Sequence, residues 1–99
     1  MVYVIFEVKT EDASKINNVV KEDIVSRQSI LTRDSSSLNI KGDVLFLKIE
    51  GSEEGVKKAE ELAKEQGFSK LDVKKAEDIN KKIAEQEDSA ASGMGMIFD

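Results

Sequence analysis

Apolar and polar residues alternate at the start of the chain, and this alternation constrains the fold more than any other feature. One face of the segment 2–9 carries Val2, Val4, Phe6 and Val8. A period of two, with β-branched and aromatic residues, is typical of a strand that turns one face toward a core. The fold therefore has to supply this strand with a sheet and with an apolar layer to cover it.

The segments that follow switch between helical and extended periods. Spacing of apolar residues predicts a helix over about Asp12–Ile24, and Val44–Glu50, the most apolar run, has the length of a central strand. A second helix begins after Ser52, a good N-cap, and ends before Gly67. Shorter extended segments are predicted at Ser26–Arg33 and Phe68–Val73. The predicted order is strand, helix, strand, strand, helix, strand.

This order resembles the ferredoxin-like βαββαβ sandwich over residues 1–73. The resemblance implies an α+β fold, with a four-stranded antiparallel sheet and two helices on one face. We expect the strand order 4-1-3-2, because segments 2–9 and 44–50 are the most apolar and suit the centre of a sheet. Ninety-nine residues suffice for one modest core, so residues 1–99 are expected to form a single domain.

Residues 74–99 extend this plan. Helical spacing predicts an added helix over 74–88, which Asp72 caps. Its apolar stripe is thin, so we expect it to pack at an edge of the domain rather than at the centre. The run from Ser89 to Gly93 predicts the end of that helix. A tail with glycines and methionines then occupies residues 89–99.

The tail is the most unusual part of the sequence. Four large apolar residues fall within its last six positions, namely Met94, Met96, Ile97 and Phe98. Chain ends are usually polar, and burying such side chains stabilises by roughly 1.5–3 kcal/mol each. We therefore expect them to be ordered, to be at least partly buried and to make a contact. The contact surface is the chain's own domain, a sister subunit or another protein.

The amino-acid composition excludes several kinds of catalytic group and disfavours several classes of partner. The chain has no cysteine and no histidine, which excludes disulfides, a thiolate nucleophile and an imidazole base. We expect no cofactor and no bound metal. The formal net charge of −5 disfavours nucleic acid as a partner. No apolar run approaches the ~20 residues of a membrane span, and we expect a cytoplasmic protein without a membrane partner.

One segment suggests a ligand site. Arg27, Ser29, Arg33 and Ser35 combine guanidinium and hydroxyl groups that suit an anion or a carboxylate. Six residues of strand span roughly 20 Å, so the two arginines cannot grip one small anion on an unbroken strand. The alternative interpretation is a solvated hairpin tip.

These features favour a non-enzymatic binding or assembly module that acts through protein–protein contacts, either with itself as a homo-oligomer or with another protein. A small-ligand regulatory domain is the alternative, since ACT-type domains have a similar layout. An enzyme that uses carboxylates is less favoured, because the sequence contains no catalytic motif.

Overall fold

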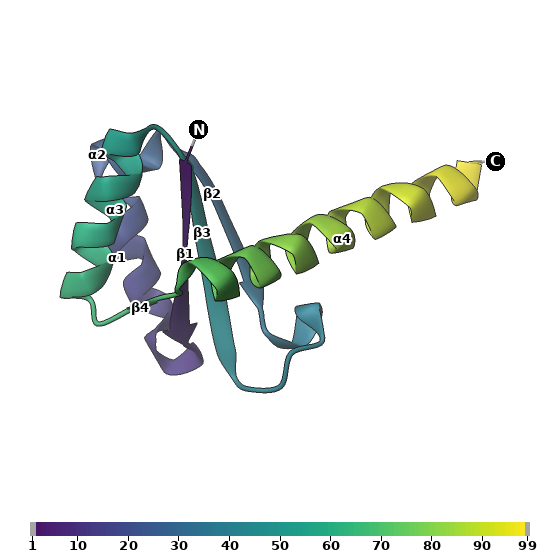
Figure 1. Cartoon of the computed structure of the whole chain (residues 1–99), viewed down its shortest axis with the longest axis horizontal. Coiled ribbons are helices and arrows are strands. Elements are labelled where there is room, and N and C mark those ends of the chain that lie inside the picture. The colour runs from purple at the N-terminus through teal and green to yellow at the C-terminus, as the bar shows by residue number, and fades with distance from the viewer. Residues whose placement is uncertain (1, 99) are drawn as a thin grey trace.

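The computed structural model describes the backbone of residues 2–98 and the side chains of residues 2–86. Its elements follow one another along the chain as β1 (Val2–Lys9), η1 (Thr10–Lys15), α1 (Ile16–Val20), α2 (Asp23–Ser26), β2 (Ser29–Asp34), η2 (Ser36–Leu38), β3 (Val44–Gly51), α3 (Glu53–Glu65), β4 (Ser69–Lys70) and α4 (Val73–Phe98). Figure 1 shows them around one sheet, with the C-terminal part of the last helix extending away from it.

The four strands form one antiparallel sheet in the order β2-β3-β1-β4. Read from the other edge, this is the predicted order 4-1-3-2. Strands β1 and β3 pair over their full length, from Val2↔Gly51 to Lys9↔Val44. The two outer strands differ, because β4 has two residues and β2 has six. The sheet therefore has one short edge and one long edge.

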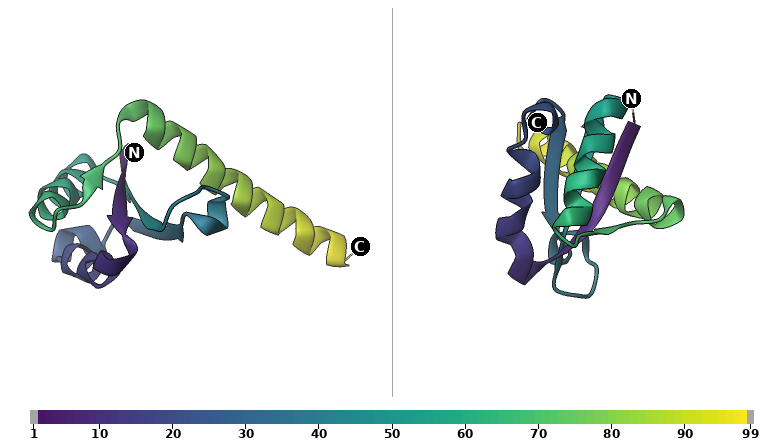
Figure 2. Two further views of the ribbon diagram at one scale, coloured as in Figure 1. Left: turned by 90° about the horizontal axis from the view of Figure 1, so that it is seen from below. Right: turned by 90° about the vertical axis from the view of Figure 1, so that its left-hand side faces the viewer.

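Helices α1, α2 and α3 cover one face of the sheet (Figure 2). The buried residues of this layer come from both central strands and from all three helices, together with Phe68: Val4, Phe6, Val8, Val19, Val25, Leu47, Ile49, Val56, Ala59 and Ala63. The alternation in β1 is thus confirmed as the pattern of a core-facing strand.

The first helical region departs from its prediction. A continuous helix over Asp12–Ile24 is wrong, because the segment divides into η1, α1 and α2. Glu22 has an extended backbone, and its carboxylate accepts hydrogen bonds from the backbone N–H groups of Ile24 and Val25 at 3.1 and 3.2 Å. This cap starts a new helix where the longer one was expected to continue.

Helix α3 follows its prediction closely. The Ser52 hydroxyl accepts a hydrogen bond from the Gly55 N–H at 3.1 Å, and Gly67 takes a left-handed backbone with φ of 79° after the last turn. Its apolar spacing predicts that Val56, Ala59, Leu62 and Ala63 face the core. Val56, Ala59 and Ala63 are buried, whereas Leu62 is half-buried at the margin of the layer.

Helix α4 covers the opposite face of the sheet, so its predicted position at an edge is wrong. Ile79 and Ile83 are 4% and 2% exposed. They belong to a second buried cluster with Ile5, Leu38, Phe46, Leu71 and Ala76. The predicted cap is confirmed, since Asp72 accepts a hydrogen bond from the Lys75 N–H at 2.8 Å. The sheet is therefore packed on both faces.

The predicted end of this helix at Ser89–Gly93 is also wrong, because α4 continues to Phe98. Serine and glycine lower helix propensity by at most about 1 kcal/mol each, which neighbouring alanines and methionines offset in part. The predicted burial of Met94, Met96, Ile97 and Phe98 lies outside the described side chains.

Candidate functional site

The predicted ligand residues divide between the two ends of β2. Arg27 precedes the strand and forms an ion pair with Asp23 at 3.3 Å, with both side chains largely exposed. Ser29 is the first residue of β2 and is exposed. Arg33 and Ser35 lie four or more residues further on, about 13 Å or more along an extended chain. The structure thus does not bring the four side chains together.

Ser35 is a structural residue of the loop that joins β2 to β3. Its side chain is 2% exposed, and its hydroxyl donates to the Gly42 carbonyl at 2.6 Å. The same oxygen accepts from the Val44 N–H at 3.4 Å. The hydroxyl is therefore engaged on both sides in closing the loop over residues 35–44.

Asp34 organises the start of that loop. Its carboxylate accepts hydrogen bonds from the Ser37 N–H at 2.9 Å and from the Ser36 hydroxyl at 3.3 Å. The backbone hydrogen bond from Ser37 is the largest cause that lowers the pKa of Asp34 from its ordinary value. The carboxylate thus binds the first two residues of the short helix η2 and has its hydrogen-bond partners within the loop.

Arg33 connects the edge of the sheet to α4. Its Nε donates to the Gln86 side-chain oxygen at 2.7 Å, and its Nη1 donates to the Thr32 carbonyl at 2.8 Å. The Gln86 amide in turn donates to the Ser37 carbonyl at 2.9 Å. Gln86 thereby fixes where α4 passes over β2 and η2. Residues beyond it run out past this edge of the sheet (Figure 1).

Beside α4, the sheet face carries a patch that the helix leaves partly uncovered. We call it the open patch, and it consists of Tyr3, Ser29, Leu31, Lys48 and Glu50. The Lys48 ammonium lies 5.4 Å from the centre of the Tyr3 ring and 3.7 Å from the Glu50 carboxylate. Four of these residues, all but Tyr3, line a shallow hollow of about 180 Å³.

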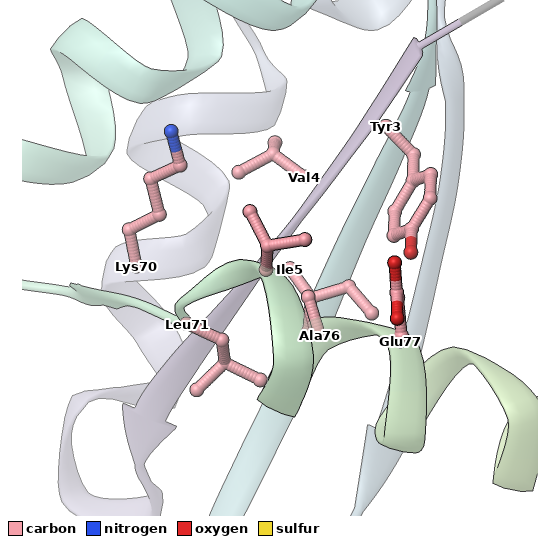
Figure 3. Close-up of a pocket in the computed structure, with 8 residues that line it drawn as sticks. Tyr3, Val4, Ile5, Lys70, Leu71, Ala76 and Glu77 are labelled. Carbon is pink, nitrogen blue, oxygen red and sulfur yellow. The ribbon is translucent and has the colours of Figure 1, made fainter.

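A second hollow of about 260 Å³ lies where α4 starts, next to β1. Its floor is apolar, with Ile5, Leu71 and Ala76 among the residues that line it. Figure 3 shows the Tyr3 hydroxyl and the Glu77 carboxylate pointing toward one another on one side of this hollow. Lys70, on the other side, forms an ion pair with Glu60 at 3.0 Å. This arrangement suits a small apolar group better than an acid–base reaction.

Among the described residues, no three acidic side chains are grouped so that they could hold a metal ion. Nor does the described part of the chain contain a helix that combines the length and the apolar character needed to cross a bilayer.

No protein-family model, no curated protein and no solved structure matches this chain. Its function therefore has to be inferred from its own residues.

Two elements of the surface were missed by sequence reasoning. The first is the link from Gln86 to Arg33, which joins residues 53 positions apart. The second is the open patch, whose members come from three strands. One signal was available for the second, because Val44–Leu47 is apolar at every position and so indicates a strand buried on both faces.

Proposed function

We propose that this chain is a non-enzymatic assembly module that pairs with a second copy of itself through the C-terminal half of α4. We call this half, residues 87–98, the arm. The observation that carries the proposal is the path of the helix. It packs on its own sheet as far as Gln86, and it then extends past the sheet edge with a run of large apolar residues (Figure 1).

The fold proposed for the module is the ferredoxin-like βαββαβ sandwich with α4 added on the second face. The element order and the strand order support this assignment. Because that sandwich hosts many unrelated functions, it adds no argument for one activity over another. The argument for assembly comes from the arm.

Sequence spacing indicates which helical face of the arm is apolar and so suits the proposed contact. At 3.6 residues per turn, Ala90, Met94 and Ile97 continue the stripe formed by Ile79 and Ile83. By this spacing, the apolar residues at positions 90, 94 and 97 fall on the same helical face of the sequence as Ile79 and Ile83. A stripe of this kind is stabilised when a second apolar surface covers it, by roughly 1.5–3 kcal/mol for each large side chain.

We choose a second copy of the chain as the partner because each chain carries both surfaces that the contact needs. Each chain carries both an arm without a sheet beneath it and a sheet face with the open patch. A symmetric pair satisfies both features with one type of contact, as twofold dimers commonly do.

The test is the mass of the full-length chain in solution. Sedimentation velocity at about 100 µM should give a dimer, and Met94→Glu should convert it to a monomer because the charge falls within the stripe. Met96→Glu is the matched control, since sequence spacing places position 96 away from the stripe, and it should remain dimeric. A monomeric full-length chain, or equal loss of dimer in both variants, would contradict the proposal.

A further inference from the structure

The outer edge of β2 is a second surface available for contact with another chain, and it lies on the side where the arm leaves the domain. Strand β2 pairs with β3 on one side only, and Ile30 at this edge is 37% exposed. The Ser35 N–H donates to the Val44 carbonyl at 2.9 Å, which fixes the alternation of backbone groups along the strand. By that alternation Ile30 and Thr32 direct their backbone groups outward, to the free edge.

The hydrogen bond at Thr32 agrees with this alternation. Its carbonyl accepts from the guanidinium of Arg33 rather than from β3. An exposed strand edge of this length can add a further strand from another chain. In such a pair a backbone N–H would replace the Arg33 Nη1 group at Thr32, while Arg33 keeps Gln86 through Nε.

The arm has the length to reach well across a second sheet joined at this edge. Residues 87–98 extend about 18 Å at 1.5 Å per residue. Neighbouring strands lie about 4.8 Å apart, so the arm spans roughly three to four strands. Its starting point is fixed, since Gln86 lies over Arg33 near the end of β2.

We propose that two copies join edge to edge through antiparallel β2 strands, so that the arm of each copy lies on the open patch of the other. This inference rests on the proposed assembly function and specifies its geometry. An antiparallel pair centred on Leu31 places Arg33 opposite Ser29 of the second copy, and a pair centred on Thr32 places Arg33 opposite Leu31. In both registers the arm leaves one copy at Arg33 and arrives over the open patch of the second.

The spacing of the two helices fits one of these two registers. The second copy's own α4 crosses its sheet at its own Arg33, which lies two to four residues along the strand from the point where the arm arrives. That separation is roughly 7–13 Å. Helices in contact lie 8–10 Å apart, so the register centred on Leu31, with about 13 Å, leaves room for the arm beside the second copy's α4, whereas the register centred on Thr32, with about 7 Å, is too close.

The open patch has the chemistry to receive an apolar stripe. The Tyr3 ring and Leu31 pack against the buried cluster under α4 and extend its apolar surface. The hollow of about 180 Å³ beside them gives room for a large side chain. Lys48 is held between the Tyr3 ring and Glu50, so its hydrocarbon stem lines the patch while its charge is already partnered.

Single-cysteine variants test this geometry, because the natural chain has no cysteine of its own. Position 94 lies eight residues beyond Gln86, about 12 Å along the helix, and so reaches the second or third strand of the other copy, where Glu50 lies in the open patch. Protein with Glu50→Cys is mixed with protein that carries Met94→Cys, and the mixture is oxidised mildly. A disulfide between the two variants can form only between different chains. We expect at least a fivefold higher yield than in a mixture of Glu50→Cys with Met96→Cys, the matched control.

The edge contact is tested separately. Oxidation of Leu31→Cys alone should give a disulfide-linked dimer, whereas Glu65→Cys, exposed at the end of α3, should not. A dimeric chain that forms neither the edge disulfide nor the disulfide between arm and patch overturns this geometry and leaves the proposed function standing. A chain that is monomeric by sedimentation overturns both.

Discussion

Gly55 lies against the side chain of Gln28, and the pair allows a quantitative test of the packing between α3 and the start of β2. A Cβ atom built at Gly55 overlaps the Gln28 side chain and lies 2.7 Å from its Cγ. That side chain makes three hydrogen bonds. Its amide donates to the Ile24 carbonyl at 2.8 Å, and its oxygen accepts from the Ser52 N–H at 2.9 Å and, at a longer 3.4 Å, from the Ser52 hydroxyl. Gly55→Ala therefore forces Gln28 to move and the two shorter bonds to break.

The expected magnitude follows from two opposing contributions. Replacing glycine by alanine in a helix stabilises by up to about 1 kcal/mol. Two lost hydrogen bonds cost about 1 kcal/mol each, and the displaced side chain leaves poorer packing. We expect Gly55→Ala to destabilise by about 1–2 kcal/mol, which lowers the melting temperature of a domain this size by several degrees.

The assay is a double-mutant cycle followed by urea denaturation. In a Gln28→Ala background there is no side chain to displace, so Gly55→Ala should be neutral or stabilising by up to about 1 kcal/mol. The coupling between the two positions should then be about 2 kcal/mol. If Gly55→Ala has the same effect in both backgrounds, the close packing of Gln28 on this glycine is wrong.

Three further predictions concern the rest of the domain. Ile83→Ala should cost about 2–5 kcal/mol in urea denaturation because the side chain is buried under α4, whereas Val73→Ala, 77% exposed on the same helix, should change stability by less than about 0.5 kcal/mol. Leu62→Ala should cost about 1–2 kcal/mol, since Leu62 is only half-buried; a loss near 4 kcal/mol would place it in the centre of the core. The lowered pKa of Asp34 contributes stability that is complete above the ordinary carboxyl pKa of about 3.9 and is lost as the pH falls through the folded value, so the stability difference between the natural chain and Asp34→Asn should shrink on acidification; a constant difference from pH 6 to pH 2 would contradict this.

The sequence predicted β1 and α3 correctly, because contacts between residues close in the sequence determine where these elements begin and end. The bounds of β1 match the alternating segment, and the ends of α3 match the cap at Ser52 and the glycine at position 67. In each case the determining contacts lie within a few residues. The break in the predicted helix over Asp12–Ile24 could not be predicted in this way, because glutamate is compatible both with the interior of a helix and with the capping position that Glu22 occupies.

The position of α4 depended on contacts that are distant in the sequence. A thin stripe of Ala76, Ile79 and Ile83 suggested edge packing, yet the sheet supplies Ile5 and Phe46 on the face that this stripe covers. The same limit applies to the candidate site. Arg33 was singled out for its guanidinium, but its role depends on the path of α4, which brings Gln86 to it from 53 residues away.

In the proposed assembly, the two halves of α4 have different roles: the first half stabilises the fold, and the arm makes the contact between copies. The first half, up to Gln86, completes the second apolar layer and ties the helix to β2 through Arg33. The described contacts that hold this half join residues 2–86, so in the proposed assembly changes at positions 94 and 97 should weaken association more than they lower the melting temperature of the dilute monomer. Changes at Ile79 or Ile83 should both weaken association and lower the melting temperature, because the arm keeps its direction only while the first half of the helix is packed. The two classes of variant therefore separate a fault in assembly from a fault in folding.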